Sequence, residues 1–163
     1  MPPISPFLIR SGDTSEGVHR VQHPWNEKSD ITMNELARRT GMTRAIVKHA
    51  VIPPGKESFV YHAHLRDEEW VYVLSGEGQA EIDGEDFDIG PGDFLGFPAP
   101  SVAHHLRNIG ESDLVLLMGG EAPEVEIADF PKLGKRKFTF GNQVNVVDLE
   151  PNEISQEPPK PTT

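Results

Sequence analysis

Short apolar runs separated by turn-forming residues fill the middle of the chain, from residue 47 to residue 118. The separating residues are mostly glycine, proline and aspartate, which adopt the backbone angles that tight turns require. The apolar runs cover residues 45–52, 59–64, 70–74, 79–82, 85–89 and 114–118. Runs of this length and spacing are typical of an antiparallel β-sandwich or β-barrel, and we predict about seven or eight strands.

Two local signals refine this pattern. The dipeptide Asp83-Gly84 lies between the runs 79–82 and 85–89 and favours the positive φ angles of a two-residue type I′ hairpin. The run 114–118 is followed by two glycines, and its length fits a buried closing strand better than a helix.

The segments on either side of this region differ in composition. Residues 125–130, 138–140 and 144–147 alternate apolar with polar positions and predict outer strands, which could pair with a partner subunit. Residues from 150 onward are too polar and proline-rich to order themselves. We therefore expect one domain: an N-terminal arm over 1–44 with at most a short helix, a barrel over 45–120, and C-terminal strands with a disordered tail over 121–163.

Charge and composition exclude several classes of protein. The net charge of −11 argues against binding to nucleic acid or to an anionic membrane surface, because both need clustered Lys and Arg. The chain has no cysteine, so it has neither disulfides nor thiolate metal sites. No signal peptide and no apolar stretch of about 18 residues is found, and we expect a cytoplasmic protein.

A group of histidines predicts a metal site. Side chains two apart on a strand point the same way, so His62 and His64 can bind one ion, and a short turn returns Glu69 from the next strand. His104 follows later in the chain as a third imidazole. Three histidines and one glutamate suit a divalent first-row metal and leave coordination positions free for water, substrate or dioxygen.

Two groups of residues resemble the two sequence motifs of the cupin superfamily. The first group is Gly55, His62, His64, Glu69 and Gly76, and the second is Gly92, Pro98, His104 and Asn108. The resemblance covers about residues 45–120. It implies an all-β double-stranded β-helix, or jelly-roll barrel, here with N- and C-terminal arms, and a metal inside its mouth held by the three histidines and Glu69.

The chain departs from the motifs at two places. Six residues rather than five lie between Gly55 and His62, which predicts a bulge. Pro100 replaces a glycine, and one extra residue precedes His104, which predicts a rigid, altered loop beside the metal.

Two of the proposed ligands have a neighbour of the same type. The family spacing selects Glu69 over Glu68, which we interpret as a surface charge. Asn108 selects His104 over His105, and strand alternation turns His105 away. A bulge would reverse that alternation, so His105 stays an alternative ligand.

Residues 34–47 also resemble a helix-turn-helix, with Gly41 in the turn and a recognition helix over 42–48. Such a segment would make the protein a transcriptional regulator. Pro53-Pro54 cuts the second helix short and the overall charge is wrong for DNA, so we favour a first barrel strand over 45–52, preceded by a short helix over 34–39.

Alternation also predicts a pocket. Val60, Val71, Val73 and Leu106 share the inward face with the ligands, and a mainly apolar cavity would admit a small molecule that offers oxygen atoms to the metal. No second acid or base stands out, so proton transfer would use Glu69 itself, a metal-bound water, or another residue such as Tyr61 or Tyr72.

These observations leave three hypotheses for function. The first is a small-molecule metalloenzyme, since the cupin resemblance implies a dioxygenase, isomerase, decarboxylase or lyase. The second is a metal-containing ligand-binding or sensor module, and the third is the transcriptional regulator. Iron, manganese, nickel or zinc is the expected metal. The expected partners are a small molecule and a second copy of the chain, as a two-fold homodimer.

Overall fold

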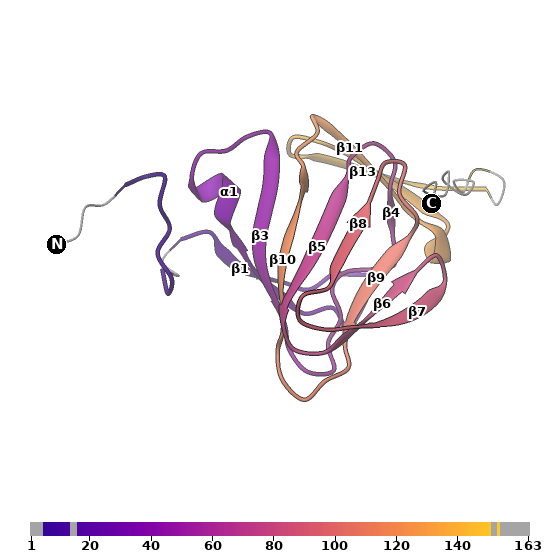
Figure 1. The fold of residues 1–163 in the computed structure, drawn as a ribbon. Coiled ribbons are helices and arrows are strands. Elements are labelled where there is room, and N and C mark those ends of the chain that lie inside the picture. The colour runs from indigo at the N-terminus through magenta and orange to yellow at the C-terminus, as the bar shows by residue number, and fades with distance from the viewer. Residues whose placement is uncertain (1–4, 14–15, 151–152, 154–163) are drawn as a thin grey trace.

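The computed structural model describes residues 5–13, 16–150 and 153, and it is almost entirely β (Figure 1). Its elements, in chain order, are β1 Val18–Val21, β2 Ile31–Glu35, α1 Leu36–Arg39, β3 Ala45–Ile52, β4 Ala63–His64, β5 Glu69–Ser75, β6 Gly78–Ile82, β7 Glu85–Ile89, β8 Phe94–Phe97, β9 His104–Asn108, β10 Leu114–Glu121, β11 Val125–Phe130, the 3₁₀ turn η1 Pro131–Leu133, β12 Lys135–Phe140 and β13 Gln143–Asp148. Within the described residues, no helix has the length and apolar character needed to cross a membrane.

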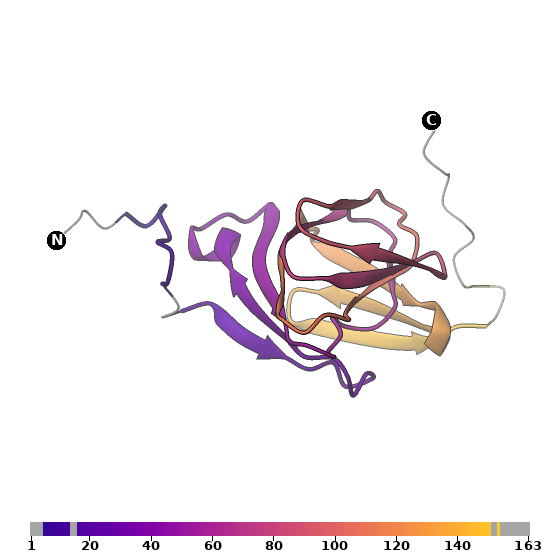
Figure 2. The same ribbon diagram turned by 60° about the horizontal axis from the view of Figure 1, so that its bottom comes forward.

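The strands form three antiparallel sheets. The largest has six strands in the order β1-β2-β3-β10-β5-β8, the second has four in the order β13-β12-β11-β4, and the third has three in the order β7-β6-β9. In Figures 1 and 2 the N-terminal segment lies on one side of the barrel and the C-terminal strands lie on the other. This arrangement is the predicted all-β jelly-roll barrel.

Apolar side chains fill the space inside the barrel. The main cluster draws on strands of the six-stranded sheet and on the β6–β7 and β9 strands that face it. Its fully buried members are Ile31, Ala50, Ile52, Val73, Ala80, Leu114 and Leu116, each 0% exposed. Burial of this kind is the main driving force for folding, and here it fixes the relative position of two sheets.

The segment that resembled a helix-turn-helix has a different structure. The only α-helix among the described residues is the single turn Leu36–Arg39, and Gly41, with φ 82°, turns the chain after it. Residues 45–52 then form β3, which pairs along its whole length with β10. The hypothesis of a recognition helix over 42–48 is therefore wrong, because β-branched residues and a neighbouring strand favour an extended backbone here. The preferred strand over 45–52 is confirmed.

Turn chemistry explains how the strands are connected. Asp83 and Gly84 have φ angles of 53° and 79°, as the predicted type I′ hairpin between β6 and β7 requires. Gly76 has φ 88°, and a Cβ atom there would lie 2.3 Å from the carbonyl oxygen of Asp113. This position therefore requires glycine for its backbone angle and for the close approach of the chain that leads into β10.

Some predicted strands have different limits. Of the run 59–64, only Ala63–His64 pairs in a sheet, as β4, while His62 forms an isolated bridge with His104. The closing strand β10 is longer than expected, because it continues through both glycines to Glu121.

The alternating C-terminal segments form β11, β12 and β13, as predicted. β11 pairs with β4 of the same chain at two residues, and β13 is the outer strand of this sheet, with all six of its residues exposed. The tail predicted to be disordered falls almost wholly on residues outside the described part of the chain.

A buried ion pair joins β11 to β12. Asp129 is 0% exposed, and its two carboxylate oxygens accept hydrogen bonds from Arg136 Nε at 2.6 Å and Nη2 at 2.8 Å. Asp129 also pairs across the sheet with Ala63 in β4. The carboxylate therefore lies in the sheet that carries His64.

We predict that Arg136→Met lowers the free energy of unfolding by about 3 kcal/mol, because the Asp129 charge stays buried without its partner. Urea denaturation of the metal-free protein measures this change. The double variant Asp129→Leu/Arg136→Met leaves no buried charge and should recover most of the loss. A single variant as stable as the parent would show that the pair contributes nothing.

Candidate metal centre

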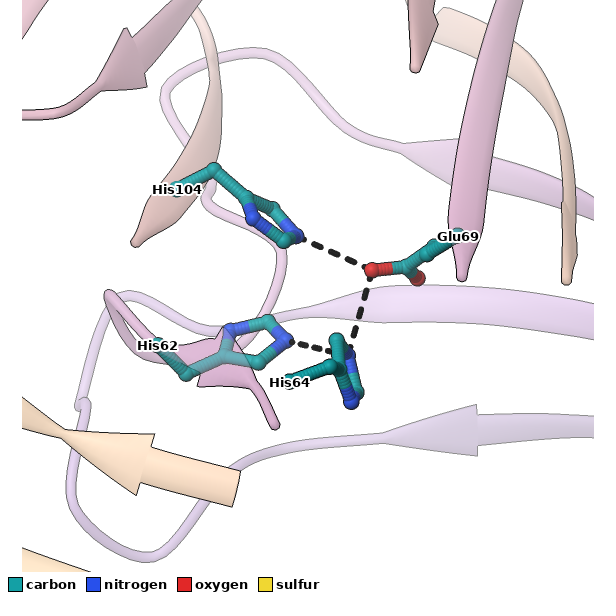
Figure 3. Close-up of side chains that lie close together, drawn as sticks. All are labelled: His62, His64, Glu69 and His104. Carbon is teal, nitrogen blue, oxygen red and sulfur yellow. Dashed lines mark hydrogen bonds and ion pairs between the residues drawn. The ribbon is translucent and has the colours of Figure 1, made fainter. Parts of the chain in front are cut away.

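Three sheets meet at the four residues predicted as a metal site (Figure 3). His64 lies in β4, where it is opposite Ala128 of β11. His62 precedes β4 and exchanges two backbone hydrogen bonds with His104, at the start of β9. Glu69 begins β5, with β8 on one side and β10 on the other. Each side chain therefore projects from a backbone that is hydrogen-bonded to a neighbouring strand.

The donor atoms of these side chains converge. His62 Nε2 is 3.1 Å from His64 Nε2, and Glu69 Oε2 is 2.9 Å from His104 Nε2 and 3.2 Å from His64 Nε2. Four ligand atoms, one from each residue, lie within 4.8 Å of one another. Two ligand atoms at right angles around an ion, each about 2.1 Å from it, would be about 3.0 Å apart.

In the imidazole rings of His62 and His104, the hydrogen bond made by Nδ1, which points away from the site, determines where the ring carries its proton. His62 Nδ1 lies 2.6 Å from the Val60 carbonyl oxygen, and His104 Nδ1 lies 3.1 Å from that of Val102. A carbonyl only accepts hydrogen bonds, so each Nδ1 carries a proton, and the His62 Nε2 presents a lone pair. The His104 Nε2 lies against the Glu69 carboxylate and presents a lone pair once a cation replaces the proton between them. Lone pairs directed at one point beside a carboxylate fit a divalent transition metal, which needs neutral imidazole and charged oxygen ligands.

Packing holds the rings in place. Phe97 stacks on the His104 ring with centroids 3.7 Å apart and an angle of 8° between the planes. His64 and His104 are buried, and their side chains are 10% and 5% exposed. Rings fixed in this way lose little conformational freedom when they bind an ion.

Burial and mutual contacts shift the pKa values of the group. Burial, together with the neighbouring His104 and His64, lowers the pKa of His62 to about 3. Burial alone would lower that of His64, but contacts with Asp67 and Glu69 outweigh burial and raise its pKa to about 10. Burial alone would raise the pKa of Glu69, but hydrogen bonds from His104 and His64 hold it well below its usual range. Without a metal, one proton therefore sits on His64, beside the Glu69 carboxylate.

The alternative ligands lie elsewhere. Glu68 is exposed, as expected for a surface charge. His105 is buried on the other side of β9, with Nε2 3.6 Å from Glu57 Oε2. Neither residue is part of the group of four.

Sequence reasoning missed two carboxylates behind His64. Asp67 Oδ2 lies 3.0 Å and Glu126 Oε1 lies 3.8 Å from His64 Nδ1. The separation of Asp67 from His64 by three residues was a usable signal, because a short turn brings such positions together. Glu126 comes from a distant strand and left no signal.

A cavity of about 710 Å³ opens beside the group, lined by His62, His64 and Glu69. Its apolar wall includes Val21, Met33, Phe59, Met118, Ala128 and Phe130. Its charged lining comprises the carboxylates of Asp67, Glu68, Glu69, Glu121, Glu124 and Glu126 and the cations of Arg38, Lys48 and Lys137. The charged lining therefore has an excess of carboxylates.

The residues expected on the pocket wall lie in the apolar core instead. Val60, Val71, Val73 and Leu106 are between 0% and 8% exposed and do not line this cavity. Alternation gave their inward direction correctly but not their depth along the barrel.

The two tyrosines considered for proton transfer also lie away from the cavity lining. Tyr61 packs under the Lys132 ammonium, and Tyr72 is 40% exposed.

Comparison with known proteins identifies the family. Residues 48–120 match the cupin domain. An uncharacterised protein of Methanocaldococcus jannaschii is 35% identical over 114 residues, which are 70% of this chain and 77% of that protein. The chain belongs to the cupin superfamily.

Two proteins with named roles are also similar to this chain. A proposed sugar phosphate isomerase from Acidithiobacillus ferrooxidans has a solved structure and is 32% identical in sequence to this cupin. The match covers 88% of this cupin and 92% of that protein's chain, and the two structures superpose with a TM-score of 0.82. The oxalate-binding protein of Thermotoga maritima is 27% identical over 113 residues, which are 68% of this cupin and 90% of that protein.

The raised pKa of His64 predicts that metal binding releases a proton. At pH 7 the His64 Nε2 of the metal-free protein is protonated, so uptake of Ni²⁺ should displace about one proton. The raised pKa keeps this proton on His64 up to about pH 10, so the metal must compete with it. The affinity for Ni²⁺ should therefore rise by as much as tenfold per pH unit between about pH 7 and about pH 8.5. Calorimetry in buffers of different protonation enthalpy measures both quantities. An affinity that is flat above pH 7 would contradict the raised pKa.

Proposed function

We propose that this cupin is a metal-dependent enzyme that acts on a small, oxygen-bearing molecule. The observation that carries the proposal is the convergence of four donor residues, of which His62, His64 and Glu69 also line a cavity large enough for a small molecule. Iron, manganese, nickel or zinc suits this donor set. A bound cation with free coordination positions would polarise a carbonyl or hydroxyl oxygen of the substrate.

The protein itself supplies orientation, water exclusion and a charged wall. The apolar side of the cavity, with Met118 and Phe130, would exclude water from the reacting part of the substrate. Two of the three cations in the lining are already paired, Lys48 with Glu35 at 3.2 Å and Lys137 with Glu126 at 3.3 Å. An acidic wall with paired cations favours a neutral or weakly anionic substrate over a multiply charged one.

Isomerisation of a hydroxy-carbonyl compound is the reaction that we propose to test first. It is supported by the similarity to the proposed sugar phosphate isomerase, which extends over most of both chains. The reaction moves a proton between neighbouring carbons, and the carboxylates that line the cavity are the groups that could hold that proton. Because the cavity wall is acidic and phosphate groups are anionic, unphosphorylated sugars should be tested as well as phosphorylated ones.

A second candidate function is metal-dependent binding without turnover. It is supported by the similarity to the oxalate-binding protein, of which this cupin covers 90%. In that case the cavity would hold a small carboxylate on the metal and release it unchanged.

We predict that the protein, purified without chelator or affinity-tag metal, holds about one transition-metal ion per chain and that His104→Ala loses it. Elemental analysis measures the metal, and circular dichroism shows whether the variant is folded. His105→Ala is the matched control and should keep the metal. Equal metal in all three proteins, or none in the parent, would refute the four-residue site.

We further predict that the metal-loaded protein exchanges a carbon-bound proton of an aldose or ketose with solvent deuterium, as detected by NMR. His104→Ala should abolish the exchange, because the substrate oxygen is then no longer polarised. Saturable binding of sugars or dicarboxylates without exchange of the proton would contradict the enzyme hypothesis and support the hypothesis of binding without turnover.

A further inference from the structure

One of the three histidines has a different outer partner from the other two. His62 and His104 direct Nδ1 at backbone carbonyl oxygens, whereas His64 Nδ1 faces the carboxylate of Asp67 at 3.0 Å. The Asp67 side chain is only 8% exposed. His64 Nδ1 and the second carboxylate oxygen, Asp67 Oδ1, are both buried and make no hydrogen bond among the described residues, so the two side chains form a close ion pair.

A buried carboxylate with an unpaired oxygen is costly to the fold, since desolvation is not fully offset. The turn that carries Asp67 is nevertheless held firmly. The Leu65 amide donates to the Ile127 carbonyl oxygen at 2.9 Å, and the Glu68 amide donates to the Glu121 carboxylate at 3.0 Å. Asp67, between these two anchors, is therefore fixed behind His64.

The second carboxylate near His64 is committed elsewhere. Glu126 Oε1 is 3.8 Å from His64 Nδ1, and its other oxygen pairs with Lys137 at 3.3 Å. That pair is close to neutral, so Asp67 is the charged partner of the ring.

We propose that Asp67 is a positioning residue that fixes the His64 ring with its lone pair at Nε2 and strengthens it as a metal ligand. A carboxylate this close to the Nδ1 proton favours one tautomer by its charge and makes the opposite nitrogen more basic. With Glu69, Asp67 also brings two negative charges to the site, which balances a divalent ion. This inference rests on the proposed metal-dependent function and assigns one part of its ligand set.

Asp67→Asn keeps an oxygen that can accept the Nδ1 proton but removes the charge, and Asp67→Ala removes both. We expect affinity for Co²⁺ to fall about 10-fold in the first variant and towards 100-fold in the second, measured by competition with a chelator. Glu77→Gln removes the same charge from an exposed residue that does not line the cavity and should change affinity by less than about threefold.

The visible absorption spectrum of bound Co²⁺ gives a readout that a purely structural role would not change. Weaker donation by His64 should shift the bands of Asp67→Asn, whereas partial unfolding would reduce their intensity without a shift. Metal-free unfolding curves show which fraction of each variant is folded at the assay temperature, so that affinities refer to folded protein.

The outcomes separate the two proposals. Failure of the parent protein to bind Co²⁺, or equal binding by His104→Ala, would overturn the metal site itself. Binding that is lost in His104→Ala but unchanged in affinity and spectrum in both Asp67 variants would overturn only the role of Asp67.

Discussion

Three imidazole lone pairs and a carboxylate cannot stay together inside an apolar barrel unless a positive charge joins them. In the metal-free protein a proton on His64 provides that charge, consistent with its pKa of about 10, while His62 is forced to stay neutral with a pKa of about 3. Contacts around the site hold the four side chains together, although burying them costs free energy of desolvation. The backbone pairing of His62 with His104 and the stacking of Phe97 are the main examples.

The barrel satisfies this constraint by drawing the donors from separate sheets. β5 belongs to the six-stranded sheet, β4 to the four-stranded sheet and β9 to the three-stranded sheet. The backbone of each of these strands can therefore shift only if its sheet moves relative to the others, and the packed core opposes that movement. The open side of the group faces the cavity, where an acidic wall and an apolar wall meet. Rigid ligands beside an adaptable, mixed surface suit a site whose metal chemistry is constant and whose substrate is set by the lining.

Local sequence patterns were enough to predict parts of this structure. β3 and the β6–β7 hairpin followed from two-residue alternation and from Asp83-Gly84, because both signals lie within a few residues. The four donors came together as expected, since their spacing along the chain matched a family pattern. Asp67 was missed because the conformation of a turn depends on anchors such as Ile127, which are distant in sequence. Val71 and Val73 were assigned to the pocket because alternation gives the face of a strand but not the depth of a residue in the barrel. The helix-turn-helix hypothesis failed for a similar reason, since pairing with β10 outweighed a local helical signal in residues 42–48.

The strand that supports His64 lies outside the segment that defines the family. Ala128 pairs with His64, and the Ile127 carbonyl oxygen holds the following turn, whereas the cupin match ends at residue 120. A minimal module cut at that boundary would keep all four donors in its sequence but lose the scaffold of one of them. Transplanting this chemistry into another protein would therefore require the β11–β12 ribbon as well. Relatives that share the motifs but differ after this point could hold the same ligands with different rigidity.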